Sequence, residues 1–161
     1  FLNTGVKQKR GEPMLSGGMA NYNLYKCKDE KWIALGSLEP KFWQGVCALL
    51  NKPDWIPRML PVPEMVTSLK KDLQEIFLTK TRDEWVAAAT PLDVCLTPIL
   101  DLDEVEKDIH LNQREMFIEV EHTDYGKLKG INQPFKFSET PAKPSWGAPL
   151  MGEDNLLLNE M

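Results

Sequence analysis

Glu39 is the residue of this sequence that is best placed for acid–base chemistry. It follows an apolar run, residues 31–35, whose β-branched and aromatic side chains predict a buried strand that stops at Gly36 and Ser37. Pro40 then suits the first turn of a helix, where its missing N–H has no intrahelical partner. A carboxylate at this strand-to-helix corner faces unpaired N–H groups and the positive end of the helix dipole, which favours its ionised form. The alternative is that Glu39 only caps the helix, and the sequence leaves both interpretations open.

The two histidines are weaker candidates for the same chemistry. His110 follows Asp108 closely, and a histidine beside an aspartate can act as an acid or a base. No nucleophile lies near it in the sequence, so we interpret His110 as a residue at a helix end that is satisfied by local backbone groups. His122 comes at the end of a predicted strand, beside a turn, and we expect no catalytic role for it.

Gly17 and Gly18 form a pair that permits close approach of the backbone to a ligand or a partner. They lie in residues 1–21, a segment with glycines and basic residues and little periodicity. Such a composition is also typical of a flexible connector, which is the second interpretation of the pair.

The hydrophobic periodicity predicts the elements that position Glu39. Residues 22–28 and 31–35 are predicted to form a hairpin, and apolar residues at helical spacing follow Glu39 as far as Leu50. Thr81 with Glu84, and Asp101 with Glu104, have the spacing of capping boxes that begin two helices. Further predictions are a proline-rich loop at 54–63, an amphipathic helix at 66–77 with Lys70, Lys71, Asp72 and Glu75 on its exposed face, and a strand at 94–100 in which Pro98 lies either at a sheet edge or near the strand's end. A helix from 101 to 108 and strands at 116–121, 127–131 and 133–137 complete the list. The fold class predicted from these elements is α+β, a small, mainly antiparallel sheet with helices packed on one face.

The composition is that of an ordinary globular protein. The chain has 161 residues, of which 42% are hydrophobic and 27% charged, enough for one domain with a core of useful size. A formal net charge of −5 argues against nucleic acid as a partner, because phosphate binding requires a basic face. No apolar run has the length of a membrane span and no signal-peptide pattern is present, so we expect a cytoplasmic protein with no membrane partner. Cys27, Cys47 and Cys95 lack metal-site or disulfide spacing and are expected to be reduced core thiols.

We expect three parts along the chain. Residues 1–21 are predicted to be a connector arm, residues 22–138 a small α+β domain, and residues 139–161 a returning C-terminal arm that packs on another chain or another part of the protein. Because the first residue is Phe1 and not methionine, we expect the chain to be a piece of a longer protein.

Short motifs at residues 14–18, 22–25, 33–43, 79–85, 97–100, 114–117 and 148–153 together span nearly the whole chain. In this order they resemble the C-terminal part of the family III CoA transferases, the CaiB/BaiF group that includes α-methylacyl-CoA racemase. The Leu-Glu-Pro-x-Phe element around Glu39 and the Thr-Lys-Thr-x-x-Glu-Trp element from Thr79 resemble the racemase branch more than the formyl-CoA transferase branch.

The resemblance implies that this chain is a small domain with its connectors. The family's large Rossmann-like domain carries the catalytic aspartate and most of the CoA site, and two such chains interlock in a homodimer. Residues 1–21 then arrive from a missing large domain, and the fragment alone is expected to be inactive. No metal, flavin or nicotinamide is implied, and there is no cofactor beyond CoA as part of the acyl-CoA substrate.

The resemblance also assigns roles to individual residues. Glu39 is expected to line the active site and to support the histidine of an acid–base pair on the large domain, and apolar positions border the acyl chain at Met14, Leu15, Tyr22 and Leu38. The implied reaction removes the proton α to a thioester carbonyl and returns it on the other face, through an enolate whose charge needs stabilisation.

Two alternatives remain open. In a CoA transferase, which moves CoA between an acyl-CoA and a free carboxylic acid, the loop at Gly17 and Gly18 would shield a covalent acyl intermediate. The other alternative is a non-catalytic interaction module that binds a partner through its arms.

Overall fold

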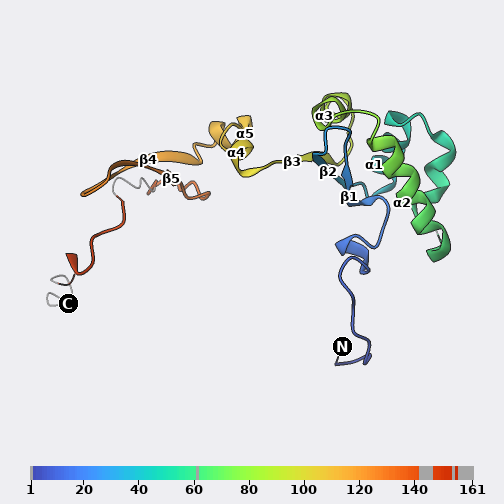
Figure 1. Cartoon of the computed structure of the whole chain (residues 1–161), viewed down its shortest axis with the longest axis horizontal. Helices are drawn as coiled ribbons and strands as arrows, with labels where there is room; N and C mark the ends of the chain where they lie inside the picture. Colours follow the sequence, from blue (N-terminus) through green and yellow to red (C-terminus); the bar gives the residue numbers. More distant parts are fainter. Residues whose placement is uncertain (1, 61, 142–146, 154, 156–161) are drawn as a thin grey trace. The chain divides into compact units, whose positions relative to one another are not determined.

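The computed structural model describes residues 2–60, 62–141, 147–153 and 155. By their internal contacts these residues divide into two units, Phe1–Ile99 and Leu100–Met161 (Figure 1). The α+β class predicted from the sequence is confirmed, because small antiparallel sheets alternate with helices. The division after residue 99 falls inside the range 22–138 that was predicted as one domain, and the boundaries at residues 21 and 138 stay predictions.

A three-stranded antiparallel sheet forms the centre of the first unit. Its strands β1 (Tyr22–Lys26), β2 (Trp32–Gly36) and β3 (Leu96–Ile99) lie in the order β1-β2-β3. The register pairs Tyr22 with Gly36 and Leu35 with Leu96. Pro98 lies on β3, an edge strand, which is one of the two placements predicted for it and one where a residue without an N–H is tolerated.

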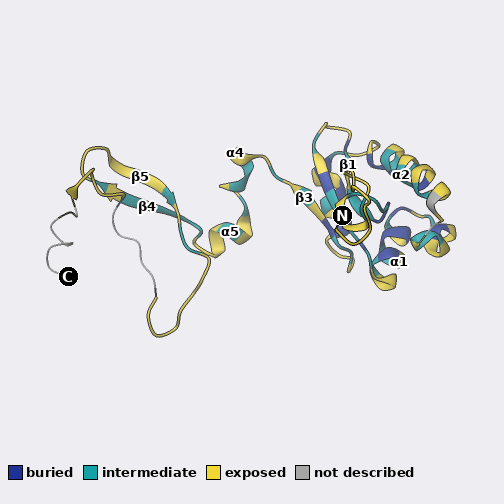
Figure 2. Cartoon of the chain, turned by 90° about the horizontal axis from the view of Figure 1, so that it is seen from below, coloured by how far each residue is buried: buried dark blue, intermediate teal, exposed yellow. Residues whose placement is uncertain are grey.

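The buried residues gather on one face of this sheet (Figure 2). Successive side chains of a strand point to opposite faces, so Ile33 and Leu35 are buried while Trp32 and Ala34 face the other side. The helices α1 (Pro40–Leu49), α2 (Pro63–Phe77) and α3 (Arg82–Ala89) supply eight further residues of the core. Its members on these helices are Trp43, Val46, Cys47, Leu69, Leu73, Phe77, Trp85 and Ala89.

The prediction of an irregular loop at 54–63 is wrong for most of that range. A short 3-10 helix, η2 (Pro53–Met59), begins at a proline, where a missing N–H costs nothing. Trp55 is buried in this helix, and its carbonyl oxygen accepts a hydrogen bond of 3.0 Å from the indole Nε1 of Trp43. The burial of one aromatic side chain therefore orders a segment that its prolines alone made look irregular.

The capping box predicted for α3 is confirmed. The backbone N–H of Glu84 donates to Thr81 Oγ1 (3.3 Å), and the Thr81 N–H donates to the Glu84 carboxylate (2.8 Å). The hydrogen bonds from Thr81 lower the pKa of Glu84, because they stabilise its charged form.

The second unit contains two short helices and a hairpin. The helices are α4 (Leu102–Val105) and α5 (Ile109–Gln113), and the strands are β4 (Phe117–His122) and β5 (Gly126–Ile131). The helix predicted to continue to residue 108 ends at Val105, because Asp108 caps the separate helix α5 by accepting from the Leu111 N–H (2.8 Å). The predicted strand at 133–137 is wrong, since these residues form no ladder. Directly before this range, the side-chain Oδ1 of Asn132 accepts a hydrogen bond from the Gln133 N–H (2.9 Å), which competes with strand pairing.

Candidate functional site

The corner between β2 and α1 is held to the start of β1 by reciprocal hydrogen bonds. The Ser37 N–H donates to Asn21 O (2.9 Å), and Asn21 Nδ2 donates to Ser37 O (2.9 Å). One residue further on, the Leu38 N–H donates to Gly36 O (3.1 Å), a three-residue turn that directs the chain away from the sheet. The helix α1 begins immediately after this turn, with Glu39 as its N-cap residue.

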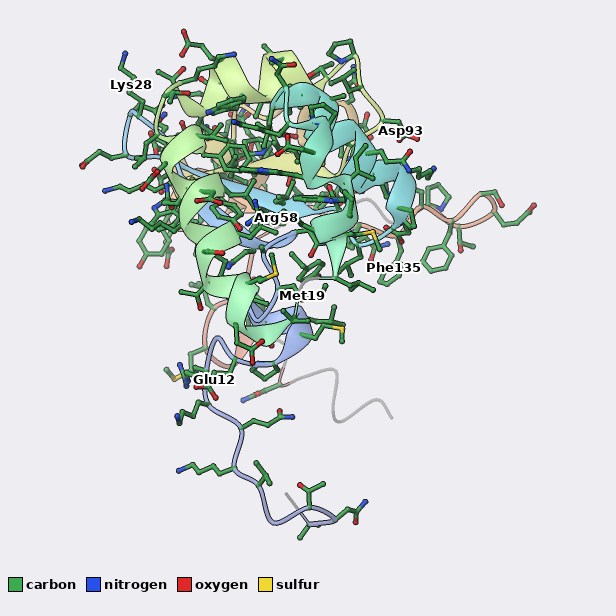
Figure 3. All side chains as sticks on the ribbon, turned by 90° about the vertical axis from the view of Figure 1, so that its right-hand side faces the viewer. Glu12, Met19, Lys28, Arg58, Asp93 and Phe135 are labelled. Atoms are coloured by element: carbon green, nitrogen blue, oxygen red, sulfur yellow. The ribbon has the colours of Figure 1, made fainter. Side chains whose placement is uncertain are left out.

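Glu39 presents its carboxylate to solvent at this corner. Its carbonyl oxygen accepts the first helical hydrogen bond, from the Trp43 N–H (3.0 Å), but its side chain makes no capping bond. Glu39 is therefore the N-cap residue by position, and its carboxylate takes no part in capping. The neighbouring cation Lys41 pairs instead with Asp93 (3.2 Å), which Figure 3 labels. Within the described part of the chain, the Glu39 carboxylate has no hydrogen-bond or ion-pair partner.

Residues 14–18 of the N-terminal segment are fixed by hydrogen bonds and backbone geometry, which is not typical of a flexible connector. The 3-10 helix η1 (Met14–Ser16) ends at Gly17, whose φ of +96° lies in the left-handed region that glycine adopts without strain. The Gly17 carbonyl oxygen accepts from Asn23 Nδ2 (3.3 Å) and from Lys70 Nζ. Lys70 is thus half-buried, and its predicted place on the exposed face of its helix is wrong.

An open groove of about 750 Å³ lies on the face of the sheet away from the helices. It contains Leu15 and Gly17 from the N-terminal segment together with Tyr22 from β1. The side chains of Leu24 and Trp32 continue it along the strands and are 53% and 43% exposed. Among the residues that the structure describes, none that lines this groove is charged; its remaining members are Ser16, Asn23, Ala34, Leu35, Gly36, Cys95 and Thr97.

A second hollow, of about 480 Å³, lies between the N-terminal segment and α2. Glu12 and Met19, labelled in Figure 3, line it together with Met14, Gly18 and Lys70. Unlike the groove, this hollow contains charged groups of both signs.

The structure thus divides the residues predicted to surround the acyl chain. Leu15 and Tyr22 meet in the groove, whereas Met14 lines the second hollow. Leu38 is half-buried, and neither Leu38 nor Glu39 lines either cavity, although both follow Gly36 of the groove by at most three residues. Their roles in a reaction stay predictions.

Asn21 holds this corner but is not among the residues predicted from the sequence to do so. A polar residue directly before a predicted strand is an ordinary finding, and only its complete burial marks it here. Leu24, Trp32 and Thr97 are groove residues that were also not predicted, although their alternation with buried positions in the strands could have indicated a second apolar face.

Cys27, Cys47 and His122 contribute little to this site, whereas Cys95 is half-buried and lines the groove, so its predicted place in the core is wrong. Burial raises the pKa of Cys27 to about 11, with a smaller contribution from Asp29, and burial raises the pKa of Cys47 to about 11 as well. Both thiols are therefore neutral and poor nucleophiles at pH 7. His122 accepts the Asp124 N–H on Nδ1 (3.1 Å), which agrees with a structural role at a turn.

Among the described residues, no group of three or more His, Cys, Asp or Glu side chains is placed to hold a metal ion. No helix in the same residues combines the length and the apolar character needed to cross a bilayer.

Gly18→Ala is expected to destabilise the first unit. A Cβ at this position would lie 2.3 Å from Glu12 O and 2.6 Å from Pro13 O, and backbone atoms cannot yield as a flexible side chain does. Overpacking of this kind costs about 1–3 kcal/mol in the free energy of unfolding, measurable by urea denaturation. Gly130→Ala is the matched control, because its Cβ would meet its nearest neighbour, in Ile118, at an ordinary 3.6 Å. Equal unfolding curves for the two variants would contradict the packing described for the N-terminal segment.

The chain as a whole is similar to a known protein family. A family model described as CoA-transferase family III matches residues 2–155. Over 146 residues the chain is 32% identical to alpha-methylacyl-CoA racemase from Homo sapiens, and the match covers 89% of this chain and 37% of that protein. Over 147 residues it is 28% identical to formyl-CoA:oxalate CoA-transferase from Rhodopseudomonas palustris (strain BisA53), with coverage of 86% and 34%.

A solved structure shows the same fold. The crystal structure of a CaiB/BaiF family protein from Brucella suis matches 99% of this chain and 42% of its own, with a TM-score of 0.70 at 20% sequence identity. The chain belongs to CoA-transferase family III. It spans little more than a third of the length of the curated relatives it matches.

Proposed function

We propose that this chain forms one wall of the active site of an acyl-CoA racemase-like enzyme. The observation that carries the proposal is the Glu39 carboxylate, which is exposed and, in the described residues, unpartnered at the start of α1. An anion in this position is available to a group outside the chain. The similarity to alpha-methylacyl-CoA racemase supports the choice of reaction.

The reaction proposed is a 1,1-proton transfer at the carbon α to the thioester. A base removes the α-proton, the electron pair of the C–H bond moves into an enolate, and an acid returns a proton to the opposite face. The acid and the base belong to the large domain. Glu39 would orient a histidine there and stabilise its protonated form, because an opposite charge within about 4–6 Å favours the charged state.

The groove is the proposed place for the acyl chain. Its lining is uncharged, and its volume of about 750 Å³ falls within the range of about 300–1,000 Å³ that is usual for small-molecule sites. Leu15, Gly17 and Tyr22 would contact the acyl group in this groove. Met14 and Gly18 line the second hollow and Leu38 lines neither cavity, so their proposed contact with the acyl group lies outside the groove.

The remainder of the active enzyme is also part of the proposal. We expect a large domain that supplies the catalytic aspartate and histidine and most of the CoA site, and a second subunit interlocked with the first. CoA enters as part of the substrate, and no other cofactor is required. Purified alone, this chain is expected to show no turnover.

Deuterium exchange tests the reaction directly. The intact protein that contains this chain is incubated in D2O with one stereoisomer of a 2-methylacyl-CoA, and the thioester is analysed by mass spectrometry and chiral chromatography. We expect one deuterium at the α-carbon together with formation of the other stereoisomer. Recovery of unlabelled substrate of unchanged configuration would contradict the proposal.

A CoA transferase is the second candidate, favoured by the match to formyl-CoA:oxalate CoA-transferase over 86% of the chain. In that reaction CoA leaves the acyl-CoA and is joined to a free carboxylic acid. The same incubation with added carboxylic acids separates the two functions, because only a transferase forms a new thioester without α-exchange. If neither reaction occurs, the chain is better explained as an interaction module.

A further inference from the structure

Asn21 and Ser37 hold the Glu39 corner to the N-terminal segment, although neither residue reaches solvent. Asn21 is 1% exposed and Ser37 0%. Beyond the last ladder pair, Tyr22 with Gly36, the Ser37 N–H still donates to Asn21 O. The return bond comes from the Asn21 side chain, whose Nδ2 donates to Ser37 O (2.9 Å). The Asn21 side-chain amide thus supplies the donor that the Asn21 backbone N–H would supply if the ladder continued. The segments that continue β1 and β2 can therefore separate at this point.

This pair connects two fixed segments. On one side, Tyr25 Oη donates to Ala20 O (2.5 Å), and the Gly17 carbonyl is held by Asn23 and Lys70. On the other side, the turn at Ser37 leads within two residues to Glu39. A displacement of the corner would therefore change where the carboxylate lies relative to the groove residues.

The pair is not arranged for stability alone. Asn21 Oδ1 and Ser37 Oγ are both buried, and within the described residues neither has a hydrogen-bond partner. Buried polar atoms without a partner cost free energy, and two apolar side chains of the same shape would avoid that cost. The presence of two polar side chains at this buried position favours a role in geometry.

We propose that Asn21 is a positioning residue that fixes the Glu39 carboxylate relative to the segment that carries Leu15 and Gly17. The inference rests on the proposed function of Glu39 and deepens it. Asn21 touches no substrate in this account. It acts through the backbone of Ser37 and the turn that follows.

A double-mutant cycle in the intact protein tests the inference. Asn21→Leu removes the donor at similar volume, and we expect kcat to fall at least about tenfold while KM for the acyl-CoA changes less. In a Glu39→Gln background the same substitution should cost no more than about twofold, because residues that act as one unit are not additive. Independent, additive losses would overturn the inference.

Gln74→Leu provides the matched control. Gln74 also holds β1 with its side-chain amide, donating to Lys26 O (2.8 Å) and accepting the Lys26 N–H (3.1 Å), but at the opposite end of the strand. We expect Gln74→Leu to lower thermal stability at unchanged kcat. A fall in kcat equal to that of Asn21→Leu would show that loosening β1 anywhere is sufficient, and would overturn the inference.

Amide hydrogen exchange of the full chain gives a readout that does not depend on turnover. Asn21→Leu is expected to accelerate exchange in the peptide that covers residues 36–43, whereas Gln74→Leu leaves this peptide unchanged. Equal exchange in wild type and Asn21→Leu would overturn the inference while leaving the function of Glu39 intact. If Glu39→Gln itself retains full turnover, the proposed role of Glu39 fails, and the role of Asn21 fails with it.

Discussion

Glu39→Gln is expected to lower the turnover of the intact enzyme by up to about two to four orders of magnitude, the usual contribution of the general acid or base that Glu39 is proposed to orient. The substitution keeps the shape of the side chain and removes its charge. Because the carboxylate is exposed and makes no capping bond, it contributes little to folding. We expect the melting temperature to change by less than about 2 °C. Steady-state kinetics and thermal denaturation of the same preparation measure both effects.

Glu64→Gln is the control for this prediction. Glu64 is also an exposed carboxylate in the first turn of a helix, α2, but no functional role is proposed for it. Its substitution should leave both turnover and melting temperature unchanged. A large fall in melting temperature with normal turnover in Glu39→Gln would return Glu39 to a structural role, against the geometry seen here.

Phe77→Ala is expected to have the largest effect on stability. Phe77 is fully buried at the end of α2 and packs against Tyr25 and Trp85, with ring centroids 5.1 and 5.2 Å away. Its carbonyl oxygen also accepts the Trp85 indole N–H (2.9 Å), so α2 and α3 are joined at this residue. Removal of a buried phenylalanine side chain costs about 3–5 kcal/mol. This is a large fraction of the total stability of a domain, about 5–15 kcal/mol.

Urea denaturation of the chain followed by tryptophan fluorescence measures this loss, since Trp85 reports on the same cluster. Phe135→Ala is the control, because Phe135 is 69% exposed in a segment without regular structure. We expect a change below about 0.5 kcal/mol for this variant. A comparable destabilisation by both substitutions would show that the core does not lie where the burial pattern places it.

The elements of the first unit were predictable because they depend on short-range patterns. The apolar run in 31–35, the proline after Glu39, and the Thr81 to Glu84 spacing each act within a few residues. The exceptions are instructive. Trp55 orders η2 through a contact with Trp43, twelve residues away in sequence, and no local pattern contains that contact.

The candidate site was predictable only in part. The resemblance to a known family selected Glu39 and the apolar residues near it, and the match to CoA-transferase family III confirms the family. The resemblance did not indicate that Leu15 and Tyr22 share a groove while Met14 lines a different hollow. Nor did the sequence indicate that the amine of Lys70 turns inward to Gly17, since a lysine among other charged residues is normally solvated.

The sequence by itself therefore determined most of the strands and helices, the corner that carries a carboxylate, and the family. The tertiary structure decided which distant residues meet at that corner. Antiparallel pairing of Tyr22 with Gly36 brings Asn21 beside Ser37. Pairing of β3 with β2 brings Thr97, and Cys95 just before β3, to the groove that also contains Tyr22 and Gly36. The physical reason is that side-chain periodicity is a local property of the chain. The register between strands and the burial of polar groups such as Asn21 arise only when segments far apart in sequence pack together.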